Sequence, residues 1–213
     1  MTDVEGVRWA LGGLSGSGGP VSVRRANFWI SRMVEVGLLD RARPTFRDGS
    51  IVWATHLAVG KVAPNLFRQT TRHEVAVALV SAHYLAAGYT WERDRKPAMR
   101  LDHQADGVAR KGDRVELVEV ELTSKTSDRY RVIFHNALHR FENEGVAQIT
   151  YFCTPDVART IEREADARVF RTERHRVVAH DVFDVKGRWV GADEGLPELP
   201  ATAVPSATLP LDF

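Results

Sequence analysis

The sequence predicts a mixed α/β fold, α+β in its overall order, arranged in two parts. Residues 23–38 carry apolar side chains at three- and four-residue steps, which is typical of an amphipathic helix, and two short strand-like segments follow. Between residues 72 and 182, strand-like and helix-like segments alternate, as they do in α/β sandwiches. The length of 213 residues suits one large domain or two small ones.

The first part, residues 1–68, is predicted to begin with two helices. The first covers residues 4–11, and a loop rich in Gly and Ser follows it over residues 12–20. The second covers residues 23–38 and starts after Ser22, whose hydroxyl is a preferred N-cap group. A glycine ends this second helix.

A β-hairpin is predicted after the second helix. Its strands are residues 43–46 and 51–54, and the turn between them is Arg47-Asp48-Gly49-Ser50, because Asp-Gly supplies the positive backbone dihedrals of a tight turn. Helix, loop, helix and hairpin is the order of a winged helix. In that comparison, the helix that normally crosses the DNA backbone ahead of the recognition helix is replaced by the loop of residues 12–20.

The second part, residues 69–194, is predicted to be an α/β domain. A helix is expected to come first, followed by three strands, a helix, a strand, a helix and a last strand. Their predicted ranges are 72–87, 89–93, 105–110, 114–122, 127–144, 147–153, 155–167 and 176–182. Residues 195–213 contain four prolines and are predicted to form a loosely ordered tail or an extended docking arm.

Two carboxylates share one face of the predicted strand over residues 114–122. With a period of two, Glu119 and Glu121 point to the same side, and Asp106 on the preceding strand would lie beside them. Such a cluster of oxygen ligands suits Mg²⁺ or Mn²⁺. The alternative is a strand near the sheet edge, with both glutamates facing water.

Short motifs in the second part resemble two nested families. The sequence places His73-Glu74 on a helix, and then Ala105-Asp106-Gly107 and Val118-Glu119-Val120-Glu121-Leu122-Thr123 on strands. The order helix, three strands, helix, strand with these acids resembles the PD-(D/E)XK nuclease core. Together with a preceding winged helix, it resembles the replication-relaxation family of actinobacterial plasmids and phages. The resemblance covers roughly residues 4–170.

The resemblance implies roles for the acidic residues. In active nucleases of this superfamily the Asp and the first Glu bind the metal, which here are Asp106 and Glu119. A lysine two residues after that Glu orients the attacking water, but this chain has Glu121 there, so an active site would need Lys125 to fold back or Arg100 to reach in. Glu74 matches the position of an additional acidic ligand in some nucleases, and a solvated glutamate is the alternative.

The winged-helix resemblance implies a set of DNA-binding residues on the recognition helix and the wing. Arg suits guanine or phosphate, and Asn suits adenine or phosphate. One of the aromatic residues Phe28 and Trp29 is expected to pack in the core. The candidates for DNA contact are Ser22, Arg24, Arg25, Asn27, Arg43, Arg47 and Lys61.

Charge and composition narrow the class of protein. Residues 1–70 hold nine Lys and Arg against five Asp and Glu, a surplus of four, although the whole chain has a net charge of only +1.

Cys153, the only cysteine, is expected to be a core residue, and no run is apolar enough to span a membrane. His135 and His139 have metal-pair spacing but no acidic third ligand nearby. A cytoplasmic protein without membrane contact is expected.

These observations lead to one principal expectation and two alternatives. The protein is expected to bind double-stranded DNA, as a homodimer, and to control replication or transcription of a plasmid, phage or other mobile element, with a degenerate nuclease-like domain. The first alternative is a Mg²⁺- or Mn²⁺-dependent DNA endonuclease in replication or mobilisation. The second is an interaction module whose α/β domain only dimerises.

Overall fold

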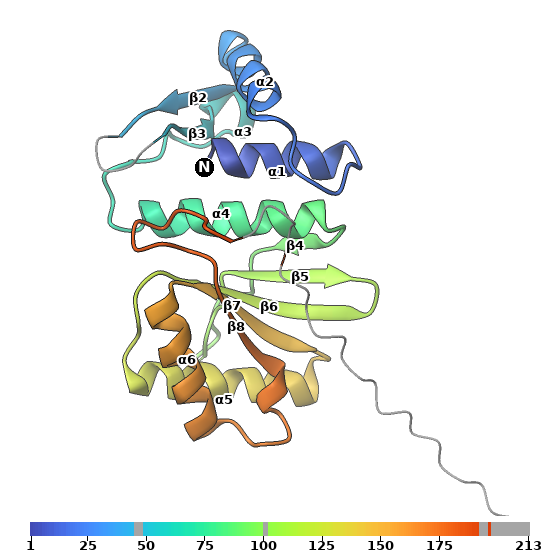
Figure 1. The fold of residues 1–213 in the computed structure, drawn as a ribbon, viewed down its shortest axis with the longest axis vertical. Coiled ribbons are helices and arrows are strands. Elements are labelled where there is room, and N and C mark those ends of the chain that lie inside the picture. Colours follow the sequence, from blue (N-terminus) through green and yellow to red (C-terminus); the bar gives the residue numbers. More distant parts are fainter. Residues whose placement is uncertain (45–48, 100–101, 192–195, 197–213) are drawn as a thin grey trace, which may run out of the picture.

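The protein has a mixed α/β fold with two sheets, as predicted (Figure 1). The computed structural model describes residues 1–44, 49–99, 102–191 and 196. Within these ranges, no helix combines the length and the apolar composition that a membrane crossing requires.

The N-terminal unit contains a three-stranded antiparallel sheet and three helices. Its sheet order is β1-β3-β2, so the central strand β3 pairs with both the first and the second strand of the chain. The elements are β1 (Thr2–Asp3), α1 (Val4–Leu14), α2 (Val23–Glu35), β2 (Leu39–Ala42), β3 (Ile51–Ala54) and α3 (His56–Val59).

The first hairpin strand lies earlier than the sequence predicts. Strand β2 is Leu39–Ala42, because Gly37 at φ 75° ends the helix and the chain enters the sheet immediately. Asp40 and Arg41 of this edge strand are exposed, so the segment lacks the apolar run that marks a strand in the sequence. Of the predicted strand 43–46, residues 43 and 44 follow β2, and residues 45 and 46 lie outside the described residues. Of the predicted turn, Arg47 and Asp48 lie outside the described residues. Strand β1 was not predicted.

Helix α2 begins where it was predicted to begin. The Ser22 hydroxyl accepts a hydrogen bond from the Arg25 backbone N–H at 3.2 Å, which caps the helix. Ala26 and Ile30 face the small core of this unit. The expected burial of one aromatic residue is wrong: Phe28 is 69% exposed and Trp29 36%, because the alanine and isoleucine occupy the buried stripe.

The α/β unit is a five-stranded sheet between helices. Its order is β4-β5-β6-β7-β8, in which the first two pairings are antiparallel and the last two parallel. The predicted order of elements is confirmed, with ends that shift by at most two residues. The elements are α4 (Thr71–Ala86), β4 (Thr90–Glu92), β5 (Gly107–Lys111), β6 (Arg114–Glu121), α5 (Ser127–Asn143), β7 (Gln148–Cys153), α6 (Pro155–Arg168) and β8 (Val177–Asp181).

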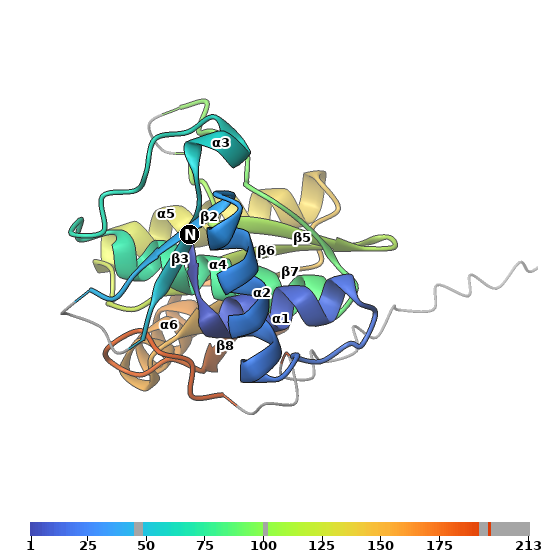
Figure 2. The ribbon, with the colours of Figure 1, turned by 90° about the horizontal axis from the view of Figure 1, so that it is seen from above.

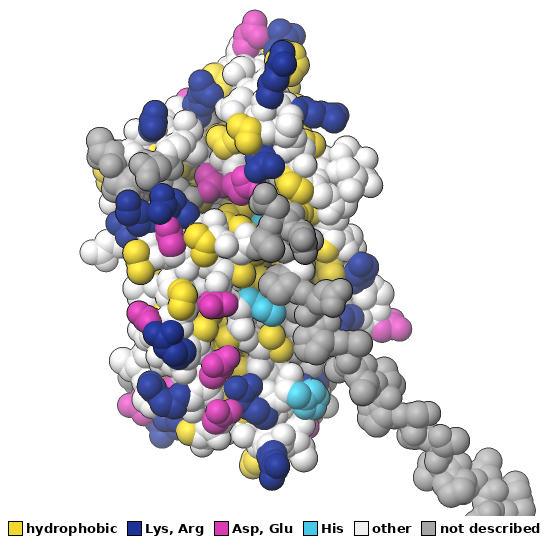
Figure 3. Space-filling view, in the orientation of Figure 1, with side chains coloured by type: hydrophobic (Ala, Val, Ile, Leu, Met, Phe, Trp, Pro, Cys, Tyr) yellow, Lys and Arg dark blue, Asp and Glu magenta, His cyan; other side chains and the backbone are white. Residues whose placement is uncertain are grey.

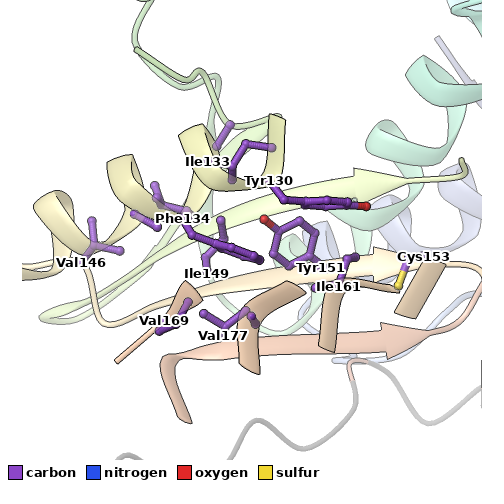
Figure 4. Packing of buried hydrophobic residues seen from close by; sticks show 14 of the residues in the cluster. Tyr130, Ile133, Phe134, Val146, Ile149, Tyr151, Cys153, Ile161, Val169 and Val177 are labelled. Atoms are coloured by element: carbon purple, nitrogen blue, oxygen red, sulfur yellow. The ribbon is translucent and has the colours of Figure 1, made fainter. Parts of the chain in front are cut away.

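Helices cover both faces of this sheet (Figures 1 and 2). Helix α4 lies on one face and buries Val118 and Val120 of β6. Helices α5 and α6 cover the other face, where Tyr130 and Phe134 of α5 meet Tyr151 of β7 (Figure 4). Strand β6 is therefore central within the sheet and shielded on both sides.

A stack of three aromatic rings joins the two units. Helix α1 packs along α4, and at their contact the ring of His83 lies 4.0 Å from Trp9 on one side and 4.1 Å from Trp189 on the other. His83 is 1% exposed, and neither of its ring nitrogens has a hydrogen-bond partner. Burial lowers the pKa of His83 to about 3, so the ring is neutral in the folded protein at neutral pH.

We expect this histidine to destabilise the fold in mild acid. Unfolded His binds a proton near pH 6.5, whereas folded His83 does so only at about pH 3, so between these values the unfolded state binds more protons. The free energy of unfolding should therefore fall as pH drops below about 6.5, with a limiting slope of about 1.4 kcal/mol per pH unit.

His83→Phe keeps an aromatic ring in the stack and removes the titration. Urea unfolding of both proteins between neutral pH and about pH 4.5 measures the difference, and the variant should gain stability relative to the wild type as pH falls. Parallel pH profiles would contradict this account.

Candidate functional site

Three glutamates of the central strand β6 are buried. Glu116, Glu119 and Glu121 are 0%, 2% and 3% exposed. The alternative in which the strand lies near an edge and its glutamates face water is therefore wrong. Burying a carboxylate costs several kcal/mol unless a cation or hydrogen-bond donors compensate it, so each of the three requires partners.

Lys125 compensates Glu121. Its ammonium lies 2.7 Å from Glu121 Oε2, and its backbone N–H donates to Oε1 at 3.1 Å. The hydroxyl of Tyr130 donates to the same Oε1 at 2.7 Å. Burial, together with the adjacent Glu121, raises the pKa of Tyr130 well above its usual value. Lys125 therefore does fold back toward the sheet, as an active site was expected to require.

His103 compensates Glu119. Its Nε2 lies 2.5 Å from Glu119 Oε1, and Arg129 donates to its Nδ1 at 3.2 Å. Because Arg can only donate, Nδ1 is the acceptor and Nε2–H points at the carboxylate. Burial raises the pKa of Glu119, and the hydrogen bond from His103 opposes that shift.

His103 is held in place by a second buried ion pair. The loop that carries it contains Asp94, whose carboxylate receives both terminal nitrogens of Arg140 at 2.6 and 3.0 Å. The same carboxylate accepts the backbone N–H of Ala105 at 2.9 Å. This network was not predicted, because its residues come from an irregular loop and from α5 and meet only in the folded chain.

Glu116 lies on the opposite face of the sheet and has its own donors. The Tyr84 hydroxyl donates to it at 2.9 Å and Arg114 Nε at 2.5 Å. The strand therefore carries acids on both faces. Only those on the α5 face belong to the predicted cluster.

Asp106 pairs with His73 at the start of α4. Its Oδ2 accepts the Val120 backbone N–H at 2.9 Å and lies 3.1 Å from His73 Nε2, which is also 3.1 Å from the carbonyl oxygen of Val120. Both neighbours of that nitrogen are acceptors, so it carries the proton. The hydrogen bond to Asp106 raises the pKa of His73, and burial partly offsets the effect.

The three predicted metal ligands do not face one open space. Asp106 lines a hollow beside Glu74, Glu121 lines a different one, and Glu119 lines neither. In the described part of the chain, no three His, Cys, Asp or Glu side chains are gathered so that they could hold a metal ion. Each carboxylate already has a cationic or hydrogen-bonding partner, so in this arrangement they do not fit a shared Mg²⁺ or Mn²⁺ ion. The assignment as metal ligands stays a prediction.

Comparison with known proteins adds no relative. Neither protein-family models, nor curated proteins, nor solved structures match this chain. The resemblance to the replication-relaxation family therefore rests on the motifs quoted above and stays a prediction.

A cleft lies at the carboxyl end of β6, against the start of α4. It has a volume of about 710 Å³ and includes the segment before α4, the loop after β6 and one residue after β8. We call it the cationic cleft, because four basic side chains line it with a single acid. Its charged lining residues are Arg68, Arg72, His73, Lys125 and Glu121.

A second basic region covers α2 and the hairpin. Arg24 and Arg25 of α2, Arg41 of β2 and Arg43 beyond it are exposed and make no salt bridge with a described carboxylate; we call these four residues the α2 surface. Arg41 was not predicted, because its segment did not appear to be a strand. Figure 3 shows Lys and Arg side chains gathered over α2 and, separately, near the start of α4.

The other residues predicted to contact DNA are Lys61, Ser22, Asn27 and Arg47, and their surroundings differ. Lys61 is exposed, after α3. Ser22 caps α2, and the Asn27 side-chain amide donates to the Val23 carbonyl at 3.1 Å, so both side chains also serve the helix itself. Arg47 lies outside the described residues.

The remaining candidates have ordinary structural roles or cannot be placed. Glu74 accepts a hydrogen bond from the Thr70 hydroxyl at 3.1 Å in the first turn of α4. Cys153 is buried, as predicted, and burial raises the pKa of its thiol to about 12. His135 and His139 are exposed on α5. Arg100 lies outside the described residues.

We expect the pair of Lys125 and Glu121 to be strongly coupled. Lys125→Met removes the cation from a buried carboxylate and should lower the free energy of unfolding by about 1–3 kcal/mol. Adding Glu121→Gln to that variant removes the uncompensated charge and should restore part of the loss. Urea unfolding of the wild type, both single variants and the double variant gives the coupling energy.

The matched control is Arg131→Met, which breaks an exposed ion pair with Asp128 on the same helix, α5. It should barely change stability. Equal effects of Lys125→Met and Arg131→Met would show that Glu121 does not depend on Lys125.

Proposed function

We propose that this protein binds double-stranded DNA through the α2 surface and controls replication or transcription of a plasmid, phage or other mobile element. The observation that carries the proposal is a set of four exposed arginines, Arg24, Arg25, Arg41 and Arg43, that form no salt bridge with a carboxylate in the described part of the chain. Unpaired guanidinium groups on a convex helix and an adjacent strand suit phosphate oxygens and base edges.

The position of α2 supports this role. Ala26 and Ile30 fix one side of the helix against the core, so Arg24 and Phe28, near the opposite side, point outward. An apolar side chain in such a place can contact a thymine methyl group while neighbouring arginines contact phosphates. The helix therefore offers both kinds of contact that sequence readout uses.

The order of elements also favours a winged-helix interpretation of the N-terminal unit. Helix α1 precedes α2, the β2–β3 hairpin follows it, and β1 completes the sheet beside β3. In this interpretation α1 takes the place of the helix ahead of the recognition helix, so the loop that follows α1 need not replace it. Helix α4 packs along α1.

Binding without cleavage is favoured by the state of the acidic cluster. Asp106, Glu119 and Glu121 are engaged by His73, His103 and Lys125 respectively. A metal ion could bind these acids only by displacing those partners. We therefore propose a degenerate nuclease-like domain.

A metal-dependent endonuclease is the second candidate function. The position of the Lys125 side chain, which folds back toward the sheet, favours this function. This lysine supplies a positive charge near Glu119 and His73 as well as Glu121. Developing charge on a phosphate could be stabilised by such a group. A purely dimerising module remains the third candidate, and the homodimer stays a prediction.

Duplex binding should depend on salt through the arginines of α2. We expect Arg24→Ala combined with Arg25→Ala to weaken binding to duplex DNA of mixed sequence. Each lost phosphate contact should reduce the slope of log affinity against log salt concentration by about one, and hence by about two in the double variant. Fluorescence anisotropy at several salt concentrations measures both quantities.

The matched control is Arg159→Ala, on the far helix α6, where the guanidinium already pairs with Asp156. It should leave affinity and slope as in the wild type. If the folded α2 double variant behaves like this control, the duplex-binding surface lies elsewhere.

Metal and cleavage assays separate the first two candidates. We expect the wild-type melting temperature to be the same with and without millimolar Mg²⁺ or Mn²⁺, because a ligand stabilises a protein only if the folded state binds it. Supercoiled plasmid should remain intact under the same conditions. Metal-dependent stabilisation and nicking that both disappear in Asp106→Ala would favour the endonuclease.

A further inference from the structure

The cationic cleft is separate from the α2 surface. It opens between the start of α4 and the loop after β6, in the α/β unit, whereas the α2 surface belongs to the N-terminal unit. Its volume of about 710 Å³ falls within the usual range of small-ligand pockets. The charge of its lining side chains and the residues at its rim indicate which class of ligand it binds.

The charge of the cleft is not neutralised internally. Glu121, the acid that lines it, is paired with Lys125. Arg68 and Arg72 are exposed at its mouth, and no described carboxylate forms a salt bridge with either. His73 also lines the cleft, but its Nε2–H is engaged by Asp106 and the Val120 carbonyl, so the unmatched positive charge comes from the two arginines.

Most arginines of the α/β unit are different, because they are matched with acids. Arg95 pairs with Asp102 and Glu144, Arg140 with Asp94, and this pairing continues in α6 and just before β8. Arg93, Arg129 and Arg171 also form no salt bridge with a described carboxylate, but they do not line this cleft, where Arg68 and Arg72 lie together. Their planar forks suit the oxygens of a phosphate.

The rim of the cleft is apolar and exposed. Phe67 is 80% exposed and precedes Arg68 directly, and Val185, on the segment after β8, is 82% exposed. An exposed aromatic ring beside a positive groove is the combination by which proteins bind single-stranded nucleic acid, since the ring stacks on a base while cations follow the backbone.

We infer that the cationic cleft binds single-stranded nucleic acid, with Arg68 and Arg72 on phosphates and Phe67 against an unpaired base. A duplex cannot make the stacking contact, because both faces of its bases are covered by neighbouring pairs. The inference concerns a site other than the α2 surface and does not rest on the function proposed above.

Fluorescence anisotropy with a labelled oligothymidylate of about twelve nucleotides tests this site. Arg68→Ala combined with Arg72→Ala should weaken binding about tenfold and flatten its salt dependence. Phe67→Ala should weaken it about fivefold or more, whereas Phe67→Trp, which keeps a stacking surface, should bind as the wild type does. The rescue by Trp is not expected if Phe67 only fills space in the fold.

Two controls separate this proposal from duplex binding and from general charge. Arg171→Ala removes an exposed arginine outside the cleft and should leave oligothymidylate binding unchanged. Arg24→Ala with Arg25→Ala should also leave it unchanged while weakening duplex binding, and the cleft variants should do the opposite. These variants therefore test duplex binding at the α2 surface and single-strand binding at the cationic cleft separately.

Oligodeoxyuridylate and oligouridylate in parallel titrations identify the sugar, because these two strands differ only in the 2′-hydroxyl group. Binding of either strand that is lost in the cleft variants supports the inference, and the tighter strand names the ligand as DNA or RNA. Absence of binding to both strands would overturn it. So would binding that the Arg68, Arg72 and Phe67 variants leave unchanged, which would assign the contact to another surface.

Discussion

The burial of carboxylates on one central strand is the constraint on which much of the α/β unit depends. Glu116, Glu119 and Glu121 cannot stay charged between two helical layers without partners. Helix α4 supplies a tyrosine for the first, a loop histidine serves the second, and a lysine after the strand serves the third. These contacts tie the central strand to α4, to the loop that carries His103 and to the loop that follows the strand.

The same compensation determines what the acidic cluster can do. A metal-dependent hydrolytic site needs carboxylate oxygens that converge on open space, whereas Asp106 and Glu119 here point to separate partners. Each of these carboxylates already has a cationic or hydrogen-bonding partner, whereas two exposed arginines at the cationic cleft form no salt bridge with a described carboxylate. This difference is why we propose binding of polyanions rather than their hydrolysis.

Contact between the two units follows from aromatic packing. Trp9 of α1 and Trp189 after β8 enclose His83 of α4, so residues far apart in the chain meet at one helix. In Figure 1 the segment after β8 lies beside α4, which places the end of the sheet close to the N-terminal unit. Because this contact is buried and apolar, the pKa of His83 is lowered to about 3, and the ring does not bind a proton near neutral pH.

Local patterns in the sequence were sufficient for much of the secondary structure. Ser22 marked the start of α2, glycines marked helix ends, and the period of two along β6 placed Glu119 and Glu121 on one face, because capping, turn geometry and side-chain alternation depend only on near neighbours. The expected two-part order of helices and strands followed from the same signals.

Only the tertiary structure decided which of those side chains are buried and what compensates them. His103 and Asp94 come from an irregular loop that carries no periodic signal, and they meet Arg140 of α5 and the acidic cluster through long-range packing. The prediction missed strand β2 at Leu39–Ala42, because an exposed edge strand needs no apolar run. Sequence therefore determined where acids and arginines lie along each element, and packing decided which of these charges are neutralised and which stay exposed, because that depends on contacts between residues far apart in the chain.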